Sequence, residues 1–250
     1  MTSNKLRKYL AKVQPSVHGV QRRTPLLLAD SKGSRLEREI SPTNIIHQSI
    51  QFRCKSGAKT HECTNWLRHH IEQEIQTHGD IHIYIWAATC DLTHKKQDHS
   101  IELTSESNDI VNNIITQYRE IASIVNHYTS SRVTFLSIPA YSIVKYNKYN
   151  RLPILDKYYD QDSILLFQIH LLNEQIGELN KLQKQTSPDF SKDLCRNPRH
   201  TTCRGQERYT KLDYNFELYQ DGIHPRFILN KVWLHKFALQ IQHDCWFPLD

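Results

Sequence analysis

A serine near the start of the chain and an aspartate–histidine pair near its end have the residue types of an acyl-transfer site. Ser31 follows the apolar run 25–29 and Asp30, and Asp221 precedes His224 by three residues. A serine hydroxyl becomes a nucleophile when a histidine takes its proton and a carboxylate orients that histidine. The two segments therefore predict Ser31 as nucleophile, His224 as general base and Asp221 as the group that orients His224.

Each of these residues also has a purely structural interpretation. Ser31 would cap a helix that begins near Lys32, because serine is a common N-cap after a strand. His224 would be a turn residue ahead of Pro225, and Asp221-Gly222 is a dipeptide that any surface turn uses. The chain has 15 histidines, so one histidine is weak evidence by itself. The catalytic interpretation depends on the order of the segments and on the elements between them.

Strand and helix patterns alternate along the chain, which favours an α/β fold with a parallel sheet between layers of helices. Apolar, β-favouring runs predict strands at 25–30, 49–54, 80–88 and 132–138, and apolar residues at helical spacing predict helices at 5–13, 32–40, 60–77, 106–128, 161–184 and 226–242. The loops after the carboxyl ends of parallel strands meet at one edge of the sheet. We therefore expect Ser31, Gly57, Cys90 and Asp91 to lie at the same edge.

In this order the segments resemble the four motif blocks of the SGNH hydrolase superfamily, the GDSL-type esterases and lipases. Those blocks are Gly-Asp-Ser, a glycine after the second strand, Gly-x-Asn-Asp and Asp-x-x-His, and here they correspond to 29–31, Gly57, 88–91 and 221–224. The resemblance covers about residues 24–242. It implies a three-layer α/β sandwich with a flavodoxin-like, five-stranded parallel sheet. The chain also resembles the esterase-like domains found in open reading frames associated with invertebrate mobile elements.

The resemblance further implies a serine esterase that acts on a small ester through Ser31, His224 and Asp221, with no metal or organic cofactor. Its oxyanion hole would consist of the backbone N–H groups of Ser31 and Gly57, with Cys90 in the place of the usual asparagine. A thiol is a weak donor, and the loss of one oxyanion donor costs about 100–1,000-fold in rate. The oxyanion hole is therefore predicted to be altered.

Other residues of the blocks have smaller predicted roles. Ala29 replaces the first motif glycine, which is acceptable if its φ is negative. Asp30 and Asp91 are predicted to shape the site through hydrogen bonds to the backbone of neighbouring loops. Cys90 would otherwise be a small apolar residue of the core, the common fate of a free cysteine.

The cysteine pattern favours neither a metal centre nor a disulfide framework. Two groups, Cys54/His61/Cys63 and Cys195/His200/Cys203, contain zinc-ligand residue types, but neither has the paired C-x2-C spacing of structural zinc sites. The six cysteines are scattered over 250 residues, which is typical of reduced thiols inside a cell. No metal is predicted.

Charge divides the chain at about residue 23. Residues 1–23 hold six cationic side chains and no acidic one. Their summed charge equals the formal net charge of +6 of the whole chain. We interpret 1–23 as a basic N-terminal arm and 24–250 as one SGNH hydrolase-like domain with a polar insertion at about 185–209. A basic arm contacts nucleic-acid phosphates or a protein partner, or is a solvated extension. The alternative function is therefore a catalytically weakened esterase-like binding module.

The sequence predicts neither a membrane span nor a secretory signal. It has no run of about 18 apolar residues, so no membrane span is predicted. The basic N-terminus lacks the apolar stretch of a secretory signal. The expected location is intracellular, in the cytoplasm or nucleus, and the sequence leaves the acyl group, the alcohol and the oligomeric state open.

Overall fold

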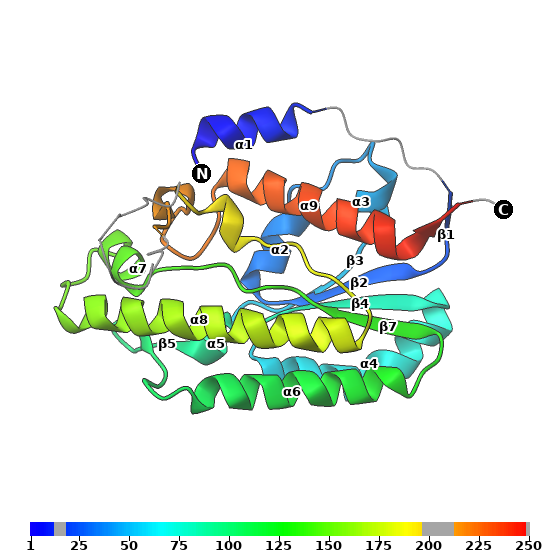
Figure 1. Cartoon of the computed structure of the whole chain (residues 1–250), viewed down its shortest axis with the longest axis horizontal. Helices are drawn as coiled ribbons and strands as arrows, with labels where there is room; N and C mark the ends of the chain where they lie inside the picture. The colour runs from blue at the N-terminus through cyan, green and yellow to red at the C-terminus, as the bar shows by residue number, and fades with distance from the viewer. Residues whose placement is uncertain (13–18, 197–212, 249–250) are drawn as a thin grey trace, which may run out of the picture.

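A parallel β-sheet with helices on both of its faces forms the centre of the molecule (Figure 1). The computed structural model describes residues 1–12, 19–196 and 213–248. The strands lie in the order β3 (Gln51–Cys54), β2 (Thr24–Ala29), β4 (Ile81–Trp86) and β7 (Ser131–Phe135), and all pair in parallel. Every residue of β4 is buried, as expected of a parallel strand that is covered on both faces. The predicted three-layer α/β fold is confirmed.

Two groups of helices cover the sheet, one on each face, as Figure 1 shows. One face carries α4 (Thr60–His78), α6 (Asp109–Asn126) and α8 (Lys157–Leu182), and the other carries α2 (Ser31–Glu37), α3 (Ile45–Ser49) and α9 (Phe227–Cys245). In α6 the buried residues recur at helical spacing, among them Ile114, Tyr118, Ile121 and Val125. An amphipathic pattern of this kind is readable from sequence because one side of the helix must meet the sheet.

Several short elements connect the main ones. They are α5 (Thr89–Leu92), α7 (Ile143–Tyr149), the antiparallel hairpin β5 (Thr93–Lys95) and β6 (Ile101–Leu103), the antiparallel pair β1 (Val20–Gln21) and β8 (Trp246–Phe247), and the 3₁₀ turns η1 (Ser191–Asp193) and η2 (Phe216–Leu218). The sequence patterns did not predict these elements, because they are too short to display a period.

Two expectations about strands need correction. The main sheet has four strands in the described part of the chain, whereas the family resemblance implied five. Near the end of the chain, residues 213–218 make a single bridge at Tyr214 and then turn through η2. Ser49, expected to begin a strand, is the last residue of α3. That helix forms because the Asn44 side chain accepts hydrogen bonds from the Ile46 and His47 backbone N–H groups.

The N-terminal segment packs on the domain. Helix α1 (Ser3–Leu10) lies on α9, as Figure 1 shows, with Leu6 fully buried and the Tyr9 ring 5.3 Å from the His235 ring. The first part of the predicted insertion is packed as well, since Phe190 is buried and Asp193 pairs with Lys236 at 2.7 Å. Residues 13–18 of the arm and 197–212 of the insertion region lie outside the described residues. No described helix is long and apolar enough to cross a membrane.

Candidate active site

Ser31 is the first residue of helix α2, directly after the loop that ends strand β2. The Asp30 carboxylate caps this helix, because its Oδ1 accepts a hydrogen bond from the Lys32 backbone N–H at 2.9 Å. The capping role considered for Ser31 therefore belongs to Asp30. Ala29 ends β2 without a positive φ, so its methyl group is accommodated where the motif has glycine.

Ser31, His224 and Asp221 form a chain of hydrogen bonds. Ser31 Oγ lies 3.1 Å from His224 Nε2, and His224 Nδ1 lies 2.6 Å from Asp221 Oδ2. An ionised carboxylate can only accept, so the proton of a neutral imidazole lies on Nδ1. His224 Nε2 is then free to accept the proton of the Ser31 hydroxyl. This is the arrangement in which a histidine acts as a base toward serine.

The Asp221 carboxylate is held in its ionised form. Burial acts to raise the pKa of Asp221, but hydrogen bonds from the His224 side chain and backbone outweigh it, so the pKa is lower than usual. Asp221 Oδ1 accepts from the backbone N–H groups of Ile223 and His224 at 3.0 and 2.8 Å. The same carboxylate therefore shapes the turn and faces the imidazole.

Gly222 allows the turn that presents His224. Its φ is +96°, and a Cβ at this position would come within 2.8 Å of the Tyr146 backbone nitrogen. The Gly222 carbonyl accepts a hydrogen bond from the Ser142 N–H at 3.1 Å, which ties the turn to the start of α7. Asp221-Gly222 is thus a turn, and the same turn orients His224.

The loops with Gly57 and Cys90 flank the loop of Ser31. This follows from the strand order, because β2 lies between β3 and β4 and all three loops leave the carboxyl edge of the sheet. Gly57 is exposed and has a φ of +81°. Burial, followed by the charge of Asp30, raises the pKa of the Cys90 thiol to about 11. Cys90 is therefore a neutral thiol at pH 7, a weak donor and a poor nucleophile.

Ala88 has a strained backbone at the start of the Cys90 loop. Its φ is +91°, in the left-handed region, and the residue is fully buried. L-residues other than glycine, asparagine and aspartate rarely adopt this conformation. The left-handed backbone explains why a glycine is suited to this position of the motif.

Asp91 connects the Cys90 loop to helix α4. Its carboxylate accepts hydrogen bonds from the backbone N–H and the hydroxyl of Thr60, both at 3.0 Å. Burial raises the pKa of Asp91, and the bonds from Thr60 partly offset this effect. Since Thr60 begins α4 just after the Gly57 loop, Asp91 holds two loops of the site edge together.

Lys32 is a buried residue of this edge that the sequence patterns do not indicate. Its side chain is 2% exposed, and Nζ contacts Asp30 Oδ2 at 2.5 Å and also donates to Thr89 Oγ1. The ammonium group lies 5.6 Å from the centre of the Trp86 ring. Lys32 thereby links the loop of Ser31 to that of Cys90. A lysine on a seven-residue helix gives no sequence signal of burial, because lysine is almost always exposed.

The described residues contain no group of three or more histidine, cysteine, aspartate or glutamate side chains that could hold a metal ion. Within those ranges Cys54, Cys63, Cys90, Cys195 and Cys245 are free thiols. His200 and Cys203 of the second zinc candidate lie outside the described residues.

Comparison with known proteins identifies similar folds. No family model and no curated protein matches the sequence. A GDSL-like lipase from Bacteroides thetaiotaomicron matches with a TM-score of 0.58 and 14% identity, over 97% of this chain and 99% of that one. The lipase/acylhydrolase from Enterococcus faecalis gives 0.52 and 13%, over 91% and 99%. An acetyl xylan esterase gives 0.52 and 14%, over 85% and 97%. The chain therefore has the fold of the GDSL-type lipases and acylhydrolases that its motif blocks resemble.

Proposed function

We propose that the protein is a serine hydrolase of the SGNH type that cleaves a small ester. The observation that carries this proposal is the hydrogen-bonded chain from Ser31 through His224 to Asp221. These residues come from opposite ends of the sequence. A packing role for each of them alone does not require the three polar groups to align.

In the proposed reaction Ser31 Oγ attacks the ester carbonyl while His224 Nε2 takes the hydroxyl proton. His224 then gives this proton to the departing alcohol, which leaves an acyl group on Ser31. A water molecule, activated by the same imidazole, releases the acid and restores the serine. Asp221 holds the Nδ1–H tautomer and offsets the positive charge that His224 acquires.

The negative charge on the carbonyl oxygen is stabilised by the backbone N–H groups of Ser31 and Gly57. Cys90 takes the third position and supplies a weak S–H donor. With one strong donor missing, turnover is expected to be about 100–1,000-fold below that of a complete oxyanion hole. The proposed enzyme is thus a hydrolase with a complete triad and a weakened oxyanion hole.

Hydrolysis of 4-nitrophenyl acetate, butyrate and octanoate by purified wild type and Ser31→Ala tests the proposal. We expect Ser31→Ala to lower kcat/KM by about 10⁴-fold or more, because nucleophile loss removes the covalent route. Ser34→Ala, three residues further along α2, is the matched control and should leave kcat/KM within about twofold of wild type. A fluorophosphonate should label Ser31 only. Equal rates for wild type and Ser31→Ala would overturn the proposal.

A second role is suggested by the surface of α1. Lys5, Arg7 and Lys8 are exposed, while Leu6 is buried against the domain. Cations held on a folded helix would bind nucleic-acid phosphates with a steep salt dependence. Fluorescence anisotropy with a labelled duplex DNA, for wild type and for the triple variant of these residues to glutamine, tests this role. Binding that does not weaken in the variant would rule out α1 as a contact surface.

A further inference from the structure

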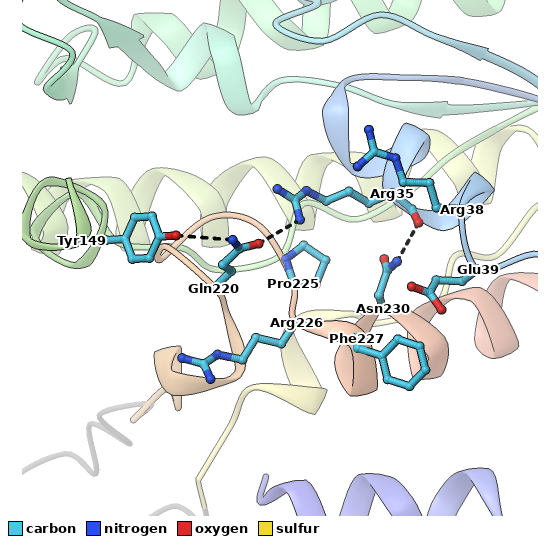
Figure 2. Close-up of a pocket in the computed structure, with 9 residues that line it drawn as sticks. All are labelled: Arg35, Arg38, Glu39, Tyr149, Gln220, Pro225, Arg226, Phe227 and Asn230. Carbon is cyan, nitrogen blue, oxygen red and sulfur yellow. Dashed lines mark hydrogen bonds between the residues drawn. The ribbon is translucent and has the colours of Figure 1, made fainter.

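Lys32 differs from the other cationic side chains of α2 because it points into the protein. Arg35, within the helix, and Arg38, its C-cap, extend to an open cavity of about 440 Å³, where Figure 2 shows Arg35 directed toward Gln220 and Arg38 turned away from it. The Lys32 side chain, in contrast, is only 2% exposed. Lysine is almost never fully buried unless its charge is paired. The groups that surround its ammonium therefore indicate what the residue does.

The ammonium group of Lys32 bonds to two loops of the site edge at once. Nζ lies 2.5 Å from Asp30 Oδ2, in the loop that leads to Ser31, and it also donates to Thr89 Oγ1. Thr89 directly precedes Cys90 and is 5% exposed. Because all three bonded side chains are buried, these bonds are made in a low-dielectric environment, where they are stronger than in water.

The bond to Thr89 is the one that connects distant segments. Asp30 precedes Lys32 by two residues and caps the same helix, so the ion pair between them holds a single loop. Thr89 is 57 residues away from Lys32 along the chain. The Lys32–Thr89 bond therefore fixes the Cys90 loop relative to the Ser31 loop.

The Cys90 loop has a backbone conformation that needs support from outside the loop. Ala88, directly before Thr89, has a φ of +91°. Strained backbone of this kind persists only where the surrounding structure holds it. Lys32 holds Thr89 through its side chain, and the Tyr141 hydroxyl donates to the Thr89 carbonyl at 3.1 Å. Two other segments thus fix the residue that follows the strained one.

We propose that Lys32 is a positioning residue of the hydrolase, whose ammonium group holds the Cys90 loop against the Ser31 loop through Thr89. This inference rests on the proposed function, because these loops supply two of the groups in the proposed oxyanion hole. Lys32 acts through Thr89 and not on the ester itself. Since the oxyanion forms only during the reaction, a displaced loop lowers kcat and leaves KM nearly unchanged.

Thr89→Val and Thr89→Ser test the proposal without unpairing the buried charges of Lys32 and Asp30. Valine has nearly the shape of threonine but lacks the hydroxyl, whereas serine keeps it. With 4-nitrophenyl acetate we expect Thr89→Val to lower kcat by about tenfold to a hundredfold, with KM within about threefold of wild type. Thr89→Ser should keep both constants within about threefold of wild type.

A second variant removes the buried charges together. In Lys32→Met/Asp30→Asn no charge is left unpaired, and asparagine still caps α2. This variant should lower kcat as much as Thr89→Val does. Addition of Thr89→Val to it should cause no further loss, because both changes break the same link.

The matched control is Lys236→Met. It breaks another lysine–aspartate pair, in which the Asp193 side chain is 3% exposed and lies 2.7 Å from Lys236 Nζ. This pair joins α9 to η1 and includes no residue of the Ser31 and Cys90 loops. Lys236→Met should lower the free energy of unfolding and leave kcat unchanged.

Hydrogen–deuterium exchange of the same variants, followed by mass spectrometry, provides a readout that does not require turnover. The peptide that spans residues 87–93 should exchange about tenfold faster in Thr89→Val and in Lys32→Met/Asp30→Asn than in wild type, because the loop opens more often. Exchange of this peptide in Thr89→Ser and Lys236→Met should match wild type.

The outcomes separate this inference from the proposed function. Faster loop exchange together with a lower kcat at constant KM supports the positioning role. If turnover depends on Ser31, either change without the other overturns the role and leaves the proposed function standing, and so does an equal loss of kcat in Thr89→Ser or Lys236→Met. If wild type and Ser31→Ala hydrolyse the ester equally, the proposed function fails. Faster loop exchange then still supports Lys32 as the link between the loops, and unchanged exchange overturns it.

Discussion

The His224–Asp221 pair and the His82–Asp244 pair lie at opposite ends of the sheet, and their surroundings differ. At the carboxyl edge His224 Nδ1 lies 2.6 Å from Asp221, and these side chains are 22% and 11% exposed. At the amino end of β4, His82 Nε2 lies 3.8 Å from Asp244, and these side chains are 1% and 3% exposed. The first imidazole faces a serine hydroxyl and solvent. The second is sealed beneath α9.

The buried pair serves the core. His82 Nε2 shares a hydrogen bond of 2.8 Å with Thr134 Oγ1, and the Tyr84 hydroxyl donates to Asp244 at 2.9 Å. Burial lowers the pKa of His82 to about 4, although Asp244 acts in the opposite direction. An aspartate near a histidine is therefore not enough to make a catalytic base. The imidazole also needs a reacting group on its free nitrogen and access for substrate.

The largest expected difference between the pairs is in turnover. His224→Gln should lower kcat/KM for 4-nitrophenyl acetate by about 10⁴-fold or more, because proton transfer from Ser31 is lost. His82→Gln is the matched change in the buried pair and should keep kcat/KM within about threefold of wild type at 25 °C. Similar losses in the two variants would contradict the comparison.

The second expected difference is in stability against acid. His82 titrates near its ordinary pKa of 6.5 in the unfolded chain and at about 4 in the folded one. The unfolded state therefore binds more protons between these values, so the free energy of unfolding falls as pH drops from 6.5 to 4. The loss is on the order of 3 kcal/mol. Urea unfolding at pH 7, 5 and 4 measures it, and His82→Gln should flatten the dependence in this window. An unchanged slope in His82→Gln would exclude His82 as the cause.

A third prediction concerns Cys90, the proposed oxyanion donor, which has a role beside the His224–Asp221 pair and none beside the buried pair. Cys90→Asn should raise kcat/KM for 4-nitrophenyl acetate by about tenfold to a hundredfold, because an amide N–H replaces a weak thiol donor. Cys90→Ala is the control and should give no increase. A rise in both variants would mean that the thiol hinders the substrate, and a rise in neither would remove Cys90 from the oxyanion hole.

The smallest effect is expected from the backbone of the same loop. Ala88→Gly should raise the free energy of unfolding by about 1 kcal/mol, because glycine relieves the strain of a positive φ. Ala87→Gly is the adjacent control, equally buried but without a positive φ, and should destabilise the fold by about 1 kcal/mol. Thermal and urea unfolding measure both changes. Destabilisation of similar size in both variants would show that the methyl group of Ala88 matters more than its φ.

Much of the fold was predictable because its signals are local. The four strands of the sheet and the long helices α4, α6, α8 and α9 have apolar patterns that a reader of the sequence can recognise. The fifth strand came from the family resemblance, and no such strand joins the sheet in the described part of the chain. Helix α7 and the hairpin of β5 and β6 were missed because short elements depend on their neighbours.

The site was predictable in its residues but not in its environment. Motif order placed Ser31, Asp221 and His224 together, and their catalytic roles stay a prediction until turnover is measured. Local sequence could not indicate that Lys32 is buried or that Ala88 has a positive φ. Each of these depends on a second segment that supplies a hydrogen bond, a charge or a packed wall.

Local patterns in the sequence are therefore enough to predict the class of fold, the main strands and helices, and a serine at a strand-to-helix turn. The packing of distant segments brings Ser31 Oγ to His224 Nε2 across 193 residues of chain, and it buries His82 while His224 stays partly exposed. The physical reason is that periodicity records which face of an element is buried, whereas hydrogen bonds and desolvation depend on which segments meet in space.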